Sequence, residues 1–106
     1  MNDIKTTIGA DGRGFFEIEE KDQRIAEMAI SVSGNELTVY HTEVSPAAEG
    51  KGLAKLLLES MADYARKNEL KVIPLCTFVA AQFKRHPDDF KDIWKKGIAG
   101  DKPVRE

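Results

Sequence analysis

A glycine-rich segment stands directly before the most regular helical pattern in the chain. It reads Glu49-Gly50-Lys51-Gly52, and no Ser or Asp occupies the position that usually caps a helix start. The first backbone N–H groups of a helix have no acceptor within the helix, and glycine lets a ligand approach them closely. Such an entrance, with a lysine beside it, suits an anion such as a phosphate group. A simple flexible turn would have the same sequence, so both interpretations stay open.

Two well-known phosphate-binding motifs are absent from this segment. A Walker loop requires Ser or Thr after the lysine, but Gly52 follows Lys51. A dinucleotide fingerprint would require a third glycine at the position of Lys55. A phosphate ligand here would therefore be held by a different kind of loop.

Three further side chains could take part in proton or group transfer. His41 and Glu43 are two apart in a strand-like run, so they share a face with Leu37 and Val39 unless a bulge intervenes. A polar end to an apolar face suggests a site, although a strand that leaves the core for solvent looks the same. Cys76, the only cysteine, lies between a predicted strand and a predicted helix, where a thiolate is stabilised. A lone cysteine is also a common small core residue.

The elements that would position these residues follow from hydrophobic periodicity. Apolar residues at spacings of three and four predict a helix from Gly52 to about Asn68. The other predicted elements are strands at 15–19, 24–32, 37–44 and 71–76, a helix at 77–85, and a short helix from Pro87 to about Lys95-Lys96-Gly97. An Asp11-Gly12 turn separates the first strand from another short strand-like run before it. The order predicts a sheet of three or four antiparallel strands, a helical crossover, a further strand and terminal helices.

Composition narrows the possible classes of protein. The 106 residues predict one domain over 1–100, followed by a flexible tail over 101–106. Sixteen basic and eighteen acidic residues give a net charge of −2, which argues against a nucleic-acid partner. One cysteine and two histidines argue against a disulfide and a metal site. No apolar run suits a signal peptide or a membrane span, so we expect a cytoplasmic protein without a membrane partner.

Four blocks in this order resemble the short, single-domain GNAT-type N-acetyltransferases. They are the segments 41–44 (His-Thr-Glu-Val), 49–54 (Glu-Gly-Lys-Gly-Leu-Ala), 74–79 (Pro-Leu-Cys-Thr-Phe-Val) and 85–87 (Arg-His-Pro). The resemblance runs from about residue 15 to 95. It implies a minimal GNAT-like α/β (α+β) fold: a mostly antiparallel mixed sheet, a βαβ crossover and C-terminal helices. It also implies an acyltransferase that moves acetyl from acetyl-coenzyme A to an amine of a small molecule or a protein.

The resemblance implies which residues would bind the coenzyme. The family's Arg/Gln-x-x-Gly-x-Gly/Ala loop holds the pyrophosphate, and Gly52 and Ala54 match its small positions, whereas Glu49 departs from Arg/Gln. The implied coenzyme contacts are Gly50, Lys51, Gly52, Leu53, Ala54 and Lys55 at the loop, Thr42, Glu43 and Val44 along a strand that splays from its neighbour, and Lys84 and Arg85 near the ribose phosphate. A solvated helix end is the alternative for Lys84 and Arg85.

The resemblance also frames the catalytic roles. An amine with an ordinary pKa of about 10.4 must lose a proton before attack, and His41 or Glu43 is the candidate base. The tyrosine acid that the superfamily often uses is missing, so Cys76 is the candidate acid or acetyl relay. The covering helices of longer members are also missing, which predicts an open acceptor site. A coenzyme-A-binding or protein-interaction domain without catalysis is the alternative function.

Overall fold

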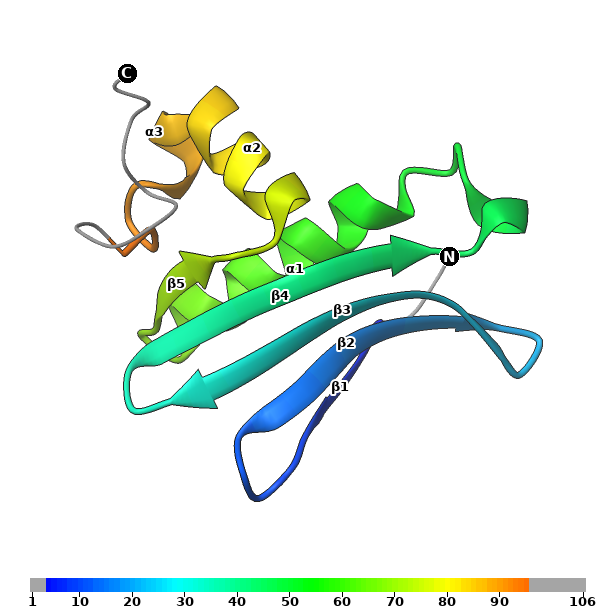
Figure 1. Ribbon diagram of the computed structural model, residues 1–106, viewed down its shortest axis with the longest axis horizontal. Helices are drawn as coiled ribbons and strands as arrows, with labels where there is room; N and C mark the ends of the chain where they lie inside the picture. The colour runs from blue at the N-terminus through cyan, green and yellow to red at the C-terminus, as the bar shows by residue number, and fades with distance from the viewer. Residues whose placement is uncertain (1–3, 96–106) are drawn as a thin grey trace.

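Five strands form one sheet in the order of the sequence (Figure 1). The computed structural model describes residues 4–95. The strands are β1 (Ile4–Ile8), β2 (Arg13–Glu20), β3 (Gln23–Ser33), β4 (Glu36–Val44) and β5 (Lys71–Pro74). The first four are antiparallel to their neighbours, whereas β5 runs parallel to β4. This mostly antiparallel mixed sheet with a helical crossover confirms the predicted fold class.

The crossover between β4 and β5 contains a 3₁₀ turn, η1 (Pro46–Ala48), and the helix α1 (Leu53–Lys67). The apolar stripe of α1 packs against β2, β3 and β4. Its buried residues are Leu53, Leu57, Leu58, Met61, Ala62 and Ala65. The helices α2 (Thr77–Arg85) and α3 (Pro87–Phe90) lie beside β5 in Figure 1, where Phe83 stacks on Phe90 with ring centroids 4.7 Å apart. A single hydrophobic core therefore joins the sheet to the helices.

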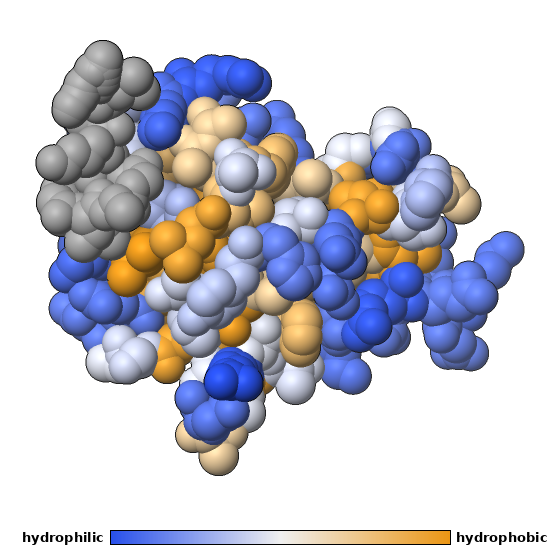
Figure 2. Space-filling view, viewed as in Figure 1, coloured by the Kyte–Doolittle hydropathy of each residue, from blue (hydrophilic) through white to orange (hydrophobic). Residues whose placement is uncertain are grey.

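One face of the sheet stays open among the described residues. Along β2 and β3 the buried side chains alternate with exposed or half-exposed ones, as a sheet covered on one side requires. Phe15 and Tyr40, which lie outside the core, are 38% and 48% exposed. Viewed from the same direction as Figure 1, the surface over β3 and β4 is mainly hydrophilic with small hydrophobic spots (Figure 2). We refer to this uncovered side as the outer face.

Several predicted boundaries need correction. The strand predicted at 71–76 ends at Pro74, because proline cannot donate to a ladder and the chain turns at Leu75. The last helix ends at Phe90 instead of about Lys95, and the chain continues through turns to a bridge between Val72 and Trp94. The predicted tail at 101–106 lies outside the described residues. Within residues 4–95, no helix is long and apolar enough to cross a bilayer.

Candidate active site

A bulge in β4 decides which side chains face the helices. Ile30 of β3 pairs with Val39 and Ala29 pairs with His41, which leaves Tyr40 as the additional residue. A bulge shifts every later side chain of the strand to the opposite face. The predicted common face of His41 and Glu43 with Val39 is therefore wrong.

Beyond the bulge, Thr42 lies opposite buried Met28 and faces the helical layer. His41 and Glu43 are exposed on the outer face. The predicted base candidates and Thr42 thus lie on opposite faces of β4.

The strands β4 and β5 part after a short parallel pairing. The ladder ends at Val39 and Pro74, and the amide of Cys76 then donates to the Val39 carbonyl at 2.9 Å. The strand β4 continues to Val44 with no strand on that side among the described residues. All four residues of β5 pair with β4, so the strand ends where the predicted splaying would begin, and Cys76 lies at that point.

The thiol of Cys76 faces this opening from the helical side. Cys76 is 5% exposed, and its Sγ lies 3.5 Å from Oγ1 of Thr42. The residue is also the N-cap of α2, and no side chain caps that helix. The thiol and the hydroxyl therefore form a polar pair at the point where the two strands diverge.

The free edge of β4 offers backbone groups to a ligand. The Ser45 amide donates to the Ile25 carbonyl of the neighbouring chain segment at 2.8 Å. Backbone groups along an antiparallel strand alternate between its two sides, so Glu43 also bonds towards β3. The N–H and C=O groups of Thr42 and Val44 then point to the free edge. Of the three residues predicted to pair with an extended ligand, these two have the matching backbone direction.

The entrance to α1 has the geometry that an anion requires. Gly50 and Gly52 have φ values of +88° and +75°, and a Cβ at either residue would meet nothing within 4 Å. Gly52 is the N-cap without a side-chain hydrogen bond, and the first turn contains no acidic residue. The Leu56 amide is the first to bond back, to the Gly52 carbonyl at 3.1 Å. The amides of Leu53, Ala54 and Lys55 precede it and have no acceptor within the helix.

The other predicted coenzyme residues differ in their placement. Lys51 and Glu49 are exposed on the loop. Lys84 and Arg85 are exposed at the last turn of α2, which Figure 1 shows running away from the start of α1. The loop and the free edge of β4 are thus adjoining parts of one crossover, whereas the structure does not bring Lys84 and Arg85 to the loop.

Sequence reasoning missed a cluster on the outer face that surrounds the candidate bases. Glu27 of β3 lies opposite Glu43 in the register, and its Oε2 is 3.6 Å from Nε2 of His41. Ligand atoms of these three residues all lie within 4.8 Å of one another. Only strand pairing places Glu27 here, so the alternating pattern of β3 could have indicated its face but not its partners.

Arg24 balances part of this charge. Its guanidinium lies 2.7 Å from Glu17 and 3.1 Å from Glu27. The hydrogen bond that Arg24 donates to Glu17, followed by the charge of Glu27, raises the already high pKa of Arg24. The guanidinium therefore stays charged and spans two carboxylates, whereas no residue between 4 and 95 forms an ion pair with Glu43.

Comparison with known proteins identifies the class of protein. A family profile described as GCN5-related N-acetyl-transferase matches residues 15–93. The chain belongs to this family, and both its fold and its family are those of an N-acetyltransferase. Among curated proteins, no sequence matches the chain.

Solved structures agree with this family. A GCN5-like putative N-acetyltransferase from Staphylococcus aureus superposes with a TM-score of 0.61 and 29% identity, over 90% of this chain and 91% of that one. The ribosomal-protein-S18-alanine N-acetyltransferase of Escherichia coli superposes with a TM-score of 0.57 and 21% identity. The match covers 62% of this chain but only 43% of the longer enzyme. The glucosamine-6-phosphate N-acetyltransferase of Arabidopsis thaliana superposes with a TM-score of 0.53 and 21% identity, over 90% of this chain and 69% of that one. At these identities the two longer enzymes show a common fold alone.

Proposed function

We propose that the protein transfers acetyl from acetyl-coenzyme A to an amine whose surroundings can be large or exposed. The observation that supports this most directly is the free edge of β4, which joins an uncapped glycine entrance at one end to Cys76 at the other. Family membership supports acetyl transfer to amines in general. The coenzyme as donor and the open acceptor side are our own assignment.

The coenzyme would lie along the crossover. Its pyrophosphate would accept hydrogen bonds from the free amides at the start of α1, aided by Lys51 and by the helix dipole. Its pantetheine arm would pair with the backbone of Thr42 and Val44. The acetyl thioester would then end near Thr42 and Cys76, where β5 has turned away.

The reaction needs three proton transfers, two from the nitrogen and one to the thiolate. The ammonium form of the acceptor loses a proton to Glu43 or His41, and the freed amine attacks the thioester carbonyl carbon. A C–N bond forms, the nitrogen loses its second proton to solvent, the C–S bond breaks, and the departing thiolate takes up a proton. Cys76 is placed to give that proton through its thiol, or to accept the acetyl group first as a relay.

The acceptor side is open because a short turn replaces any covering helix between β1 and β2. That turn is closed by the Gly12 amide on the Gly9 carbonyl at 3.0 Å. After the bulge, the β4 residues on the outer face, His41 and Glu43, are exposed. A protein side chain or chain terminus could reach β4 without displacing a lid.

Binding and catalysis should be tested in that order. Acetyl-coenzyme A at one hundred times its Kd should stabilise the native state by about 2.7 kcal/mol and shift the amide NMR signals of residues 42–55. A panel of amines, scored by mass for acetylated product, then tests turnover. Binding without any product would favour the non-catalytic coenzyme-A-binding domain, and no binding at millimolar coenzyme would refute the proposal.

A further inference from the structure

A hollow of about 470 Å³ lies on the outer face over β2, β3 and β4. In the strand register, Phe15 of β2 lies opposite Ala29 of β3, and Ala29 lies opposite His41 of β4. The bulge adds Tyr40 beside His41, and the three ring-bearing residues line the hollow together with Ala29. A small residue therefore forms the floor between three rings.

Two polar contacts hold the rings of β4 apart. The Tyr40 hydroxyl shares a hydrogen bond of 2.8 Å with Oγ of Ser31, two residues beyond Ala29 along β3. On the other side of Ala29, Oε2 of Glu27 lies 3.6 Å from Nε2 of His41. Four steps along a strand span about 13 Å, so two rings that start from adjacent residues diverge over Ala29. They form the walls of a V-shaped space, which we call the aromatic slot.

The aromatic slot has the dimensions of one further ring. Aromatic pairs favour centroid separations of about 4.5–7 Å in stacked or edge-to-face arrangements. A ring inserted over Ala29 would contact Tyr40 on one side and His41 on the other, and Phe15 would close the end. Phe15 and Tyr40 are themselves exposed, so their apolar surface is free to be buried by such a contact.

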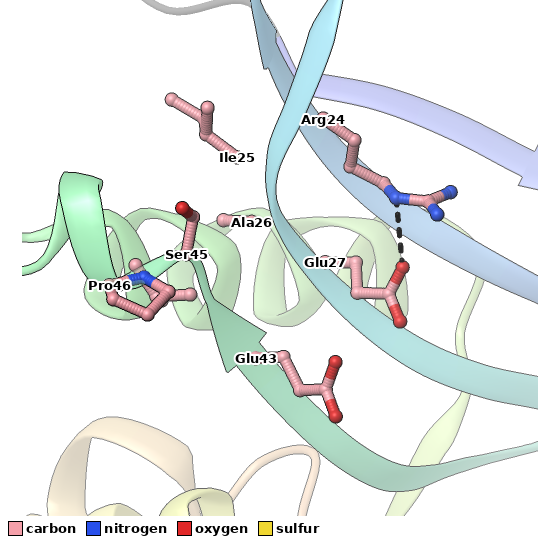
Figure 3. A pocket seen from close by; sticks show the side chains of 8 residues that line it. Arg24, Ile25, Ala26, Glu27, Glu43, Ser45 and Pro46 are labelled. Carbon is pink, nitrogen blue, oxygen red and sulfur yellow. Dashed lines mark ion pairs between the residues drawn. The ribbon is translucent and has the colours of Figure 1, made fainter.

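The charges around the slot favour a neutral ring. Arg13 lines the slot with a side chain that is 84% exposed and lies 3.8 Å from Asp11. Its guanidinium would repel a quaternary ammonium ion but would stack on the face of a neutral ring. Towards the other end of the face, Figure 3 shows Glu27 and Glu43 pointing the same way, with Arg24 paired to Glu27. The phosphate of a nucleotide would be repelled there.

We propose that the aromatic slot binds an aromatic side chain of a peptide that the protein acetylates. The outer face is basic at Arg13 and acidic at Glu27 and Glu43, and the slot lies between these ends. A peptide would lie along the face with its amine towards the acidic end and a carboxylate towards Arg13. The inference rests on the proposed function, and it adds what the acceptor carries beside its amine.

The slot lies within reach of the proposed donor. His41 is followed directly by Thr42, whose hydroxyl contacts Cys76 on the helical side of β4. Ala29 is one strand away from this edge, about 5 Å within the sheet. An extended peptide spans about 3.3–3.6 Å per residue, so the bound ring and the reacting amine would be only a few residues apart.

A titration without coenzyme measures binding at the slot separately from catalysis. The probe is a pentapeptide with lysine first, phenylalanine third and glutamate last, separated by glycines, and the reference peptide has alanine third. We expect the phenylalanine peptide to shift the amide NMR signals of residues 13–15, 29–31 and 38–41. It should bind about tenfold or more tightly than the alanine peptide, the scale of burying a phenyl group. Equal binding of the two peptides would overturn the proposal.

Two variants change the floor and one wall of the slot. Ala29→Leu and Tyr40→Ala should each weaken binding of the phenylalanine peptide about tenfold or more and leave the alanine peptide unaffected. Leu56→Ala is the matched control, because Leu56 is 37% exposed, close to the 38% of Phe15, but belongs to α1 behind the sheet (Figure 1). Melting curves show which variants are folded. Unchanged binding in a folded slot variant would overturn the proposal.

Other occupants of the slot give different results. Tetramethylammonium and adenosine monophosphate should leave the amide signals of the slot in place. If either binds there more tightly than the phenylalanine peptide, the inference is wrong. If sedimentation shows a dimer that Ala29→Leu disrupts, a second copy of the chain covers the slot and the inference is also wrong.

Turnover provides the second readout. With acetyl-coenzyme A, Ala29→Leu should raise KM for the phenylalanine peptide about tenfold with kcat largely kept. If wild-type protein acetylates both peptides with equal KM, the slot inference is wrong and the proposed function stands. If acetyl-coenzyme A does not bind, the proposed function fails, and the titration without coenzyme still decides whether the slot takes an aromatic side chain.

Discussion

Gly52→Val should separate coenzyme binding from folding at the start of α1. Gly52 has φ +75°, a region that costs a residue with a Cβ about 1–2 kcal/mol, so the variant should lose about 4–16 °C of melting temperature. Nothing lies within 4 Å of the added Cβ, so no clash within the protein adds to this cost. The same open space is where a pyrophosphate would approach the amides. We therefore expect coenzyme Kd to rise at least about tenfold, or about 1.4 kcal/mol.

Gly34→Val is the matched control for this experiment. Gly34 has φ +59° and equally open surroundings, but it lies in the turn between β3 and β4 at residues 34–35. Both variants should lose similar stability in thermal unfolding, and only Gly52→Val should lose affinity in isothermal titration with coenzyme A. Equal coenzyme affinity in the two folded variants would refute the loop assignment.

Three further changes test other parts of the structure. Cys76→Ser should lower turnover by about 10²-fold with coenzyme affinity nearly unchanged, and a relay predicts an acetylated thiol, seen by mass without acceptor; full activity would leave Cys76 a packing residue. Gly14→Ala should destabilise the fold by about 1–3 kcal/mol in urea, because the new Cβ would lie 2.1 Å from the Thr7 carbonyl oxygen across β1 and β2; wild-type stability would contradict that close approach. The hydrogen bond from Arg66 lowers the pKa of Asp92 below its ordinary 3.8, so this exposed pair contributes up to about 1 kcal/mol above that pH and loses it as pH falls further. Urea midpoints of wild type and Arg66→Met should therefore converge below about pH 4; a constant difference across the acid range would argue against this assignment.

The sequence predicted the elements because their hydrophobic periods differ. The stripe from Leu53 to Ala65 repeats as a helix does, and Leu37 and Val39 alternate as a half-buried strand does. The glycine entrance and the placement of Cys76 at a helix start followed from the same boundaries. The contact between Cys76 and Thr42 could not be predicted in the same way, because it depends on how the crossover brings the end of β5 back beside β4.

The faces of β4 could not be predicted from its sequence. The residues from Leu37 to Val44 have no glycine or other signal at the bulge, and Tyr40 leaves the alternation only because Ala29 pairs with His41. That single shift moves His41 and Glu43 to the outer face. Glu27 was missed for the same reason, because its nearness to both residues depends on pairing between strands.

The bulge at Tyr40 also accounts for how one strand could serve both substrates. Without it, Glu43 would follow Leu37 and Val39 towards α1, where an unpaired carboxylate in the core is costly. With it, Thr42 turns to the Cys76 thiol while Glu43 joins Glu27 on the outer face. The next strand has already ended at Pro74, so the edge between these two faces is free for an extended ligand. Under the proposed function, the donor and the acceptor would then meet across the width of one strand.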